Sequence, residues 1–480
     1  MRNWLWPRLL SVFLAGQGVV SQIQLDVNDP KSIENAAATA AFNMMSNYHG
    51  NESGQIPGKL PDTWWEGGAM FMTLIQYWFW TGDTSYNEVT TQGMLWQKGN
   101  NDYFPANDSN FLGNDDQVFW GLAAITAAEL NFPEQDGEPS WLSLAQGVFN
   151  TQVPRWDMTS CGGGLRWQIF PYQAGYTTKN AISNGGLFQL AARLGRYTGN
   201  QTYMDWAEKI WDWSAITPLL RLDEWTIADT TTMETNCTDH GDLQWTYNYG
   251  TYLSGAAYMY NLTNGGEKWK KAIDGYLGTT LDKFFPKEFG GKVMSEISCE
   301  PNMMCDRNQD CFKGFLSSWL TFMTTIVPYT ADQIIPKIQA SALAAAKQCS
   351  GGNTKTQCGR RWHQDNWDGS KGLEQDMSAL SVFSSTMIAH KNQSLSPLTS
   401  DTGGTSKSDP SAGSGPQKQP NTPRPITVGD HVGASILTVV VAGGWIAAVS
   451  WMVYVQVQKV TAAFEDQQSF NSLSAVWFSP

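Results

Sequence analysis

Residues 65–86 read WEGGAMFMTLIQYWFWTGDTSY, and this stretch decides the fold. Residues 65–80 are apolar at most positions, so a helix here has no polar face to turn toward water. A helix that is hydrophobic all round is a buried helix. The closing TGDTSY is echoed by TGNQTY at 198–203, after a second segment of the same kind. The sequence therefore predicts a repeat built on buried helices.

Segments of this buried kind alternate strictly with amphipathic segments. Buried helices are predicted at 65–80, 115–130, 181–197, 247–261, 312–327 and 374–390. Amphipathic helices are predicted at 32–49, 84–98, 139–156, 202–218, 267–285 and 331–349. Six inner helices surrounded by six outer ones make an all-α fold, an (α/α)6 toroid. An α-solenoid of stacked helical hairpins is the alternative topology.

The connections between these segments are unequal in length. Those that lead from an inner to an outer helix are short. Those that lead from an outer to an inner helix are long, and they comprise 50–64, 99–114, 157–180, 219–246, 286–311 and 350–373. All the long loops therefore lie at one end of the toroid, above the N-termini of the inner helices. Long loops on a rigid scaffold commonly carry function.

Composition narrows the class of ligand. The chain has 480 residues, with 31 Lys and Arg against 44 Asp and Glu, which gives a net charge of −13. A nucleic-acid-binding protein needs a basic surface, so that class is excluded. Trp is unusually frequent, at 23 residues. Aromatic faces combined with neutral hydrogen-bonding groups are what a sugar cleft requires.

The N-terminus and the cysteines indicate the secretory pathway. Residues 1–21 have the pattern of a signal peptide. N-glycosylation sequons follow at Asn51, Asn107, Asn200, Asn236, Asn261 and Asn392. The seven Cys residues predict up to three disulfides and one free thiol in an oxidising compartment. Zinc binding is disfavoured, because no CxxC occurs and no His lies near Cys299, Cys305 and Cys311.

The C-terminal part differs from the body at 22–391. Residues 392–431 are rich in Ser, Thr, Gly and Pro and predict a flexible, disordered linker. Residues 432–455 are apolar and long enough to span a bilayer, and 456–480 form a polar tail. The small residues at 411–415 followed by the apolar run resemble a GPI-attachment signal. The polar tail departs from such signals, so a transmembrane anchor stays open. Either anchor places the body on the outer face of the plasma membrane or in the cell wall.

The second inner helix begins with the pair Asp115–Asp116 at the end that carries the long loops. Helix capping by these residues is the simplest interpretation. Glycoside hydrolysis, however, needs two carboxyl groups beside one bond. Side chains that diverge from Cα atoms about 3.8 Å apart can hold carboxyls roughly 5 Å apart, the separation of a retaining mechanism. One pKa of such a pair should rise, which makes that group the proton donor.

Motifs at the same end of the toroid resemble glycoside hydrolase family 76, in particular its fungal membrane-anchored members. The matching stretches are WWEGGA at 64–69, NDD at 114–116, GGLRWQ at 163–168, NGGLF at 184–188 and TYNYG at 246–250. The resemblance implies retaining cleavage of α-1,6-mannoside bonds, with Asp115 as nucleophile and Asp116 as acid/base. The candidate substrate-binding residues are Trp65, Glu66, Arg166, Trp167, Asn184, Asp229, Tyr247, Asn248 and Tyr249.

For fungal members the resemblance further implies transfer of the mannose core of GPI anchors to wall glucan, as part of cell-wall biogenesis. We expect no cofactor, no metal and a monomeric protein. Hydrolysis and transfer stay open at this point. The alternative functions are an (α/α)6 lyase or epimerase and an inactive sugar-binding surface protein. Lyases and epimerases usually rely on His, Tyr or Arg for proton abstraction, and of the five His only His240 and His363 lie in the long loops.

Overall fold

The structure is a computed structural model that describes residues 22–391, 395–415 and 427–475. The predicted signal peptide and the sequon at Asn392 lie outside the described residues. The chain divides into two compact units, one up to Pro420 and one from Asn421, and each is considered by itself.

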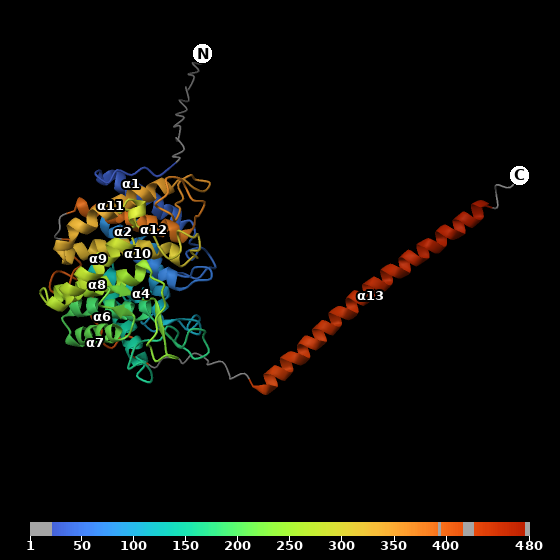
Figure 1. Cartoon of the computed structure of the whole chain (residues 1–480), viewed down its shortest axis with the longest axis horizontal. Helices are drawn as coiled ribbons and strands as arrows, with labels where there is room; N and C mark the ends of the chain where they lie inside the picture. The colour runs from blue at the N-terminus through green and yellow to red at the C-terminus, as the bar shows by residue number, and fades with distance from the viewer. Residues whose placement is uncertain (1–21, 392–394, 416–426, 476–480) are drawn as a thin grey trace, which may run out of the picture. The chain divides into compact units, whose positions relative to one another are not determined.

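The first unit is a closed ring of six inner helices (Figure 1). Each inner helix packs against the next, and the last packs against the first, so the ring closes. This closure confirms the toroid and excludes an open solenoid. The inner helices are α2 (Trp65–Thr81), α4 (Asn114–Glu129), α6 (Ala181–Thr198), α8 (Thr246–Leu262), α10 (Gln309–Ile326) and α12 (Leu373–Ser385, continued by the 3-10 turn Thr386–Ala389).

Six outer helices surround this ring, each beside an inner neighbour. They are α1 (Pro30–Met45), α3 (Asn87–Trp96), α5 (Trp141–Gln152), α7 (Gln201–Ile216), α9 (Glu267–Lys283) and α11 (Ala331–Gln348). The predicted alternation is confirmed. The helix bounds differ by a few residues, and both α3 and α5 are shorter at both ends than the predicted 84–98 and 139–156. Single-turn 3-10 helices follow at 153–155, 287–289 and 328–330.

The backbone conformation of glycine explains why the turns TGD and TGN recur at the ends of two inner helices. Gly82 and Gly199 end α2 and α6 in the left-handed region, with φ of 78° and 67°. Glycine adopts this conformation without the penalty of a Cβ, which is why it commonly ends helices. Inside the ring, a Cβ on Gly68 would lie 2.8 Å from Cγ of Trp120. Gly68 therefore lets α2 and α4 approach closely enough to bury the Trp120 ring.

The long loops lie at the N-termini of the inner helices, as predicted, and they contain the few strands. The strand β1 (Thr178–Asn180) pairs antiparallel with β4 (Thr230–Thr232). The strand β2 (Leu220–Arg221) pairs with β3 (Thr226–Ile227) in the same way. The first pair joins the third long loop to the fourth.

Three disulfides brace these loops, and one thiol stays free, in agreement with the sequence analysis. Cys161–Cys237 joins the third and fourth loops, Cys299–Cys305 lies in the fifth, and Cys349–Cys358 lies in the sixth. The free thiol is the buried Cys311. Of the three cysteines Cys299, Cys305 and Cys311, the first two are therefore joined to each other and only Cys311 is a thiol.

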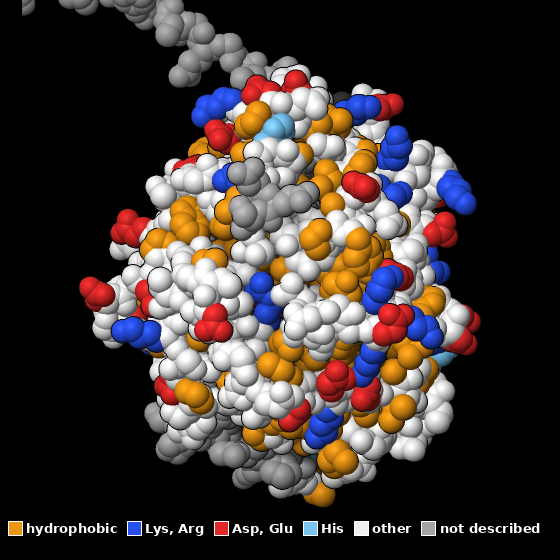
Figure 2. Space-filling model, turned by 90° about the vertical axis from the view of Figure 1, so that its left-hand side faces the viewer, with side chains coloured by type: hydrophobic (Ala, Val, Ile, Leu, Met, Phe, Trp, Pro, Cys, Tyr) orange, Lys and Arg blue, Asp and Glu red, His pale blue; other side chains and the backbone are white. Residues whose placement is uncertain are grey.

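Charged side chains of both signs are interspersed on the face shown in Figure 2, and no continuous basic field crosses it.

Residues 395–415 lie on the body, although the sequence analysis assigned them to a flexible linker. The Leu398 N–H donates to the carbonyl of Glu129 at 2.8 Å, and the Ser400 N–H donates to Tyr197 at 3.0 Å. Farther along, Asn150 donates to the carbonyl of Ala412 at 2.9 Å, and Ala412 is 5% exposed. We call residues 395–415 the strap. Several of its backbone groups thus pair with body residues, which its linker-like composition did not indicate.

The second unit contains one long helix, α13 (Val428–Ala475). Its stretch His431–Ala462 is apolar and long enough to cross a membrane. The helix continues past the predicted apolar segment, so the first part of the predicted polar tail is helical as well.

We expect the strap to stabilise the body. A soluble form that ends at Lys391 should melt several degrees below one that ends at Gly415, because it loses several hydrogen bonds worth roughly 0.5–1.5 kcal/mol each. Differential scanning calorimetry of the two forms measures the difference. The substitution Ala412→Glu in the longer form is the control, and it should reproduce part of the loss. Equal melting temperatures for all three proteins would show that the strap adds no stability.

Candidate active site

A cleft of about 450 Å³ opens among the long loops, at the N-terminal end of the inner helices. Its walls come from five of the six inner helices or the loops before them. The lining residues are Trp65, Asp115, Asp116, Phe119, Trp167, Gln168, Ile182, Asp229, Leu243, Trp245, Tyr247, Asn308, Gln309 and Phe312. The aromatic share of this lining is high, and its remaining polar groups are amides and carboxyls.

Asp115 and Asp116 stand side by side in the first turn of α4 and face this cleft. Asp115 Oδ1 accepts the N–H of Asp116 at 3.1 Å, and Asp115 Oδ2 accepts the Asn180 amide at 3.4 Å. Asp116 Oδ2 accepts the N–H of Gly113 at 2.6 Å. The N-cap is Gly113 rather than Asn114 or Asp115, and Asp116 accepts its N–H as the third residue of a capping box. Both aspartates also line the cleft.

The two carboxyls share an environment that opposes a double negative charge. Burial raises the pKa of Asp116 to about 6. Burial, followed by the charge of Asp116, raises the pKa of Asp115 well above its usual range. Close carboxylates titrate as a pair, so near neutral pH the two groups hold one proton between them. A shared proton beside a carboxylate is the requirement for acid-assisted displacement at a glycosidic carbon.

The N-terminus of α4 is fixed in place by the third long loop. The Asn114 N–H donates to the carbonyl of Trp167 at 2.9 Å, and the Asn114 amide donates to the carbonyl of Arg166 at 2.9 Å. From below, Arg155 donates to the side-chain oxygens of Asn114 and Gln117 at 3.0 and 2.6 Å. These buried contacts hold the aspartate pair through its backbone.

At Gly113 the backbone lies too close to its neighbours to leave room for a side chain. A Cβ at Gly113 would lie 2.3 Å from Asp115 Oδ1 and 3.2 Å from the carbonyl oxygen of Trp167. A side chain here would therefore push on both the carboxyl of Asp115 and the loop that carries Trp167.

A third carboxyl lines the same cleft. Asp229 is held next to β1 by its carbonyl, which accepts the Ala181 N–H at 2.8 Å. Its carboxylate accepts the Asn248 amide at 2.9 Å, and burial raises its pKa. Asn180, the residue before Ala181, is the one that contacts Asp115. The short β1–β4 pairing thus sets the spacing between Asp229 and the aspartate pair.

Four of the nine predicted substrate-binding residues line the cleft, namely Trp65, Trp167, Asp229 and Tyr247. Their exposure fits contact with a ligand. Trp167 is 36% exposed, and Tyr247 stacks flat on Phe312 with ring centroids 3.7 Å apart. The indole of Trp65 donates to Asn308 at 3.2 Å and packs against Phe119.

The other five lie behind the lining, where they support it. Asn184 is fully buried and holds the backbone of Leu165 at 2.8 and 3.0 Å. Arg166 pairs with Asp157 at 2.9 Å. Asn248 is fully buried and fixes Asp229.

The remaining two of these residues are fully buried as well. Tyr249 donates its hydroxyl to Gln244 at 2.7 Å. Glu66 forms an ion pair with Arg307 at 3.1 Å, and burial followed by Glu374 raises the pKa of Glu66 to about 9.

Sequence reasoning missed several lining residues. Asn308 and Gln309 stand at the start of α10, where the prediction had begun the helix at residue 312. Gln168 follows Trp167 in the stretch GGLRWQ at 163–168. Leu243 and Trp245 come just before α8. Proximity to the N-terminus of an inner helix is the signal that could have found them.

Among the described residues, the lining contains carboxylates and amides but no Lys, Arg or His. His240 and His363, the two His of the long loops, lie outside this lining. His240 contacts Arg221, and His363 stacks on Phe289. A cleft with this charge balance repels anionic sugars such as uronates and admits neutral ones.

Comparison with known proteins agrees with this geometry. The sequence model of glycosyl hydrolase family 76 matches residues 32–400. The chain is 41% identical to mannan endo-1,6-alpha-mannosidase DCW1 of Saccharomyces cerevisiae over 93% of this chain and 98% of that protein. It is 38% identical to mannan endo-1,6-alpha-mannosidase DFG5 of the same yeast, over 92% of this chain and 96% of that protein.

Solved structures repeat the fold. The crystal structure of Dfg5 from Chaetomium thermophilum, in complex with glucosamine, superposes with a TM-score of 0.77 at 42% identity and covers 82% of this chain and 98% of that one. An inactive variant of the α-1,6-mannanase GH76A of Salegentibacter, with two consecutive aspartates replaced and α-1,6-mannotriose bound, has a TM-score of 0.60 at 16% identity, covering 74% and 99%. On the extent of the family match and of the yeast relatives, the chain belongs to glycosyl hydrolase family 76.

Proposed function

We propose that this protein is an endo-acting α-1,6-mannosidase or transglycosidase of retaining mechanism. The observation that carries the proposal is the buried Asp115–Asp116 pair at the N-terminus of α4, inside an aromatic cleft without cations among its described residues. The names of the fungal relatives supply the sugar and the linkage. The bacterial mannanase whose inactive variant lacks two consecutive aspartates supports the same pair as the reacting groups.

The hydrogen bonds suggest which aspartate does what. Asp115 receives two donors, one on each carboxyl oxygen, and it sits at the positive end of the helix dipole. These contacts partly offset the burial that raises the pKa of Asp115, and so they favour the ionised form that a nucleophile needs. Asp116 receives one donor, on Oδ2. Its Oδ1 has no hydrogen-bond partner among the described residues and can hold the proton. Asp115 is therefore the proposed nucleophile and Asp116 the proposed acid/base.

The reaction then takes two steps. Asp115 attacks the anomeric carbon while Asp116 gives its proton to the departing glycosidic oxygen, and a covalent mannosyl ester forms. Asp116, now ionised, removes a proton from the incoming hydroxyl, whose oxygen attacks the anomeric carbon and displaces the Asp115 carboxylate. Water as the acceptor gives hydrolysis, and a sugar hydroxyl gives transfer. Trp65, Trp167 and Tyr247 offer ring faces to the mannose units, and Asp229 is placed to bind a hydroxyl in the cleft.

The cellular role follows from the two ends of the chain. We propose that the protein enters the secretory pathway and is held at the outer face of the plasma membrane or in the wall, by α13 or by a GPI anchor in its place. Its substrates would be α-1,6-mannan or the mannose core of GPI anchors, with wall glucan as an acceptor and a monomer as the working form. Incubating the soluble body with an α-1,6-mannoside donor and glucan acceptors, with products resolved by mass, separates hydrolysis from transfer.

The first test is removal of the nucleophile. We expect Asp115→Asn to lower kcat/KM on α-1,6-mannotetraose by several orders of magnitude. The melting temperature at pH 7 should not fall, because burial raises the pKa of Asp115 and its ionised form costs stability in the folded state. Asp116→Ala should be nearly inactive on mannan and regain activity on aryl mannosides with good leaving groups, which need no proton. Normal turnover by a folded Asp115→Asn protein would overturn the assignment.

The pH profile should be bell-shaped, because the pair works with one proton. The pKa of Asp116 is raised to about 6, and the pKa of Asp115 is raised well above its usual range. Below about pH 6 both carboxyls are therefore protonated, the nucleophile is lost and kcat/KM on mannan should fall. At high pH the pair loses its remaining proton, so the acid is lost and kcat/KM should fall again. With an activated aryl mannoside the alkaline fall should be shallower. A rate on mannan that does not fall at high pH would contradict a carboxylic acid as the proton donor.

Ring stacking should supply part of the affinity. In the inactive Asp115→Asn background, Trp167→Ala should weaken binding of α-1,6-mannotriose several-fold in titration calorimetry, since aromatic contacts contribute about 0.5–1.5 kcal/mol each. The matched control is Trp96→Ala, which removes a Trp that is 63% exposed outside the cleft. Equal affinity of the two variants would show that Trp167 does not contact the sugar.

A further inference from the structure

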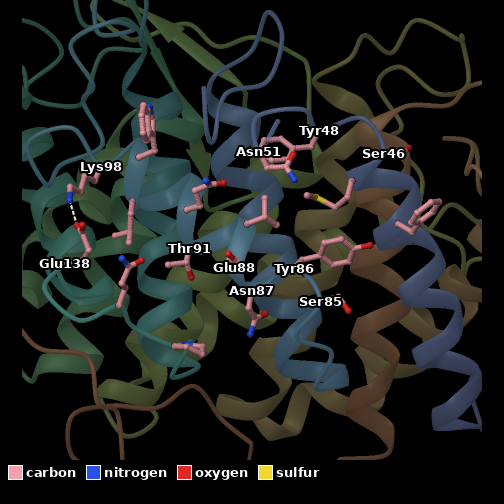
Figure 3. Close-up of a pocket in the computed structure, with 18 residues that line it drawn as sticks. Ser46, Tyr48, Asn51, Ser85, Tyr86, Asn87, Glu88, Thr91, Lys98 and Glu138 are labelled. Carbon is pink, nitrogen blue, oxygen red and sulfur yellow. Dashed lines mark hydrogen bonds and ion pairs between the residues drawn. The ribbon is translucent and has the colours of Figure 1, made fainter. Parts of the chain in front are cut away.

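A second hollow of about 1270 Å³ lies on the outer wall of the toroid, and it shares no lining residue with the cleft (Figure 3). It is a groove between α1, α3 and the loop at 133–138. The cause is the length of α3, which has 10 residues where α1 has 16. The short helix leaves the outer layer incomplete, and the flanks of its neighbours stay uncovered.

The groove exposes large apolar side chains. Phe42 is 61% exposed and Trp96 is 63% exposed, and the partly buried Met45, Tyr86 and Leu95 line the groove with them. Single exposed apolar residues are common, but a contiguous patch usually marks a surface that something else covers.

The polar part of the lining indicates the chemistry of the occupant. It consists mostly of amides and hydroxyls, namely Ser46, Asn51, Ser85, Asn87, Thr91, Gln92 and Gln135. The charges are few. Lys98 and Glu138 neutralise each other in an ion pair, which leaves Glu88 (Figure 3). Aromatic faces among neutral hydrogen-bonding groups suit a neutral saccharide.

One of these lining residues is itself a glycan acceptor. Asn51 begins the sequon Asn-Glu-Ser at 51–53, and it is exposed and lies next to Tyr48 in the lining of the groove (Figure 3). Its side-chain amide makes no hydrogen bond to another residue in the described part of the chain. A glycan attached there is tethered to the groove, so it experiences an effective concentration of the order of millimolar. Weak stacking on the aromatic rings is then enough to hold it.

We propose that the N-linked glycan of Asn51 lies in this groove and covers Trp96 and Phe42. The saccharide replaces the missing outer-layer surface and turns an apolar wall into a polar one. This role is separate from the proposed mannosidase activity, and a test can refute either proposal without affecting the other.

The experiment uses the full chain, secreted by a eukaryotic host and purified in detergent. Peptide mass mapping gives the occupancy of Asn51, and hydroxyl-radical labelling of the folded protein gives the accessibility of Trp96 and Phe42. The variant Ser53→Ala removes the sequon and keeps Asn51. We expect it to raise the labelling of both aromatic residues several-fold. The matched control Thr202→Ala removes the exposed sequon at Asn200 and should leave their labelling unchanged.

Two further measurements keep the test independent of the folding of Ser53→Ala. Trimming the folded protein with an endoglycosidase should raise the labelling in the same way. Trp96→Ala should raise the labelling of Phe42 while Asn51 stays glycosylated, because the glycan loses its main platform. The proposal fails if Asn51 is unmodified, or if loss of its glycan leaves Trp96 as accessible as before. It also fails if added α-1,6-mannotriose protects Trp96 in the glycosylated protein, since the groove would then take an external sugar.

Discussion

Inner helices without a polar side cannot face water, and this requirement shapes the whole molecule. In α4, the segment from Gln117 to Glu129 is buried at every position. Such a helix must be surrounded on all sides, by two inner neighbours and by an outer layer. The ring satisfies this for all six helices at once and leaves their N-termini together at one end. The cleft lies there because that end carries the long loops, and the helix dipole favours carboxylates at that position.

The fold could be derived from sequence because it depends on periodicity, which is a local property. The segments from Trp65 and from Ala181 have no polar face, and the structure buries both as inner helices. The strap could not be derived in this way. Its Ser, Thr and Gly residues resemble those of a linker, and its order comes from partners such as Glu129 and Tyr197, more than 190 residues away in sequence. Composition carries no information about such distant contacts.

The candidate active site shows the same contrast between features that can be read locally from the sequence and features that depend on distant contacts. The Asp115–Asp116 pair was found because its position at a helix start and its chemistry can both be read locally. The neighbouring motifs are harder to interpret, since a polar residue near the mouth of the cleft can either line the cleft or support the residues that line it. Asn184 and Tyr249 proved to be supports, buried behind the wall, whereas Asn308 and Gln309 line it. Which side of the wall a residue occupies depends on how several loops pack together, and no single segment contains that information.

Ring closure joins the two ends of the body. The last inner helix, α12, packs against α1 and α2, which are about 300 residues earlier in the chain. Contacts of this kind raise the contact order, and proteins rich in them fold slowly. A chain is synthesised from its N-terminus. One side of α2 therefore stays uncovered until α12, the helix that completes its surroundings, has been synthesised. The closed ring thus ties the folding of the first inner helix to the end of translation of the body, and α2 is the place where an incomplete chain would expose the most apolar surface.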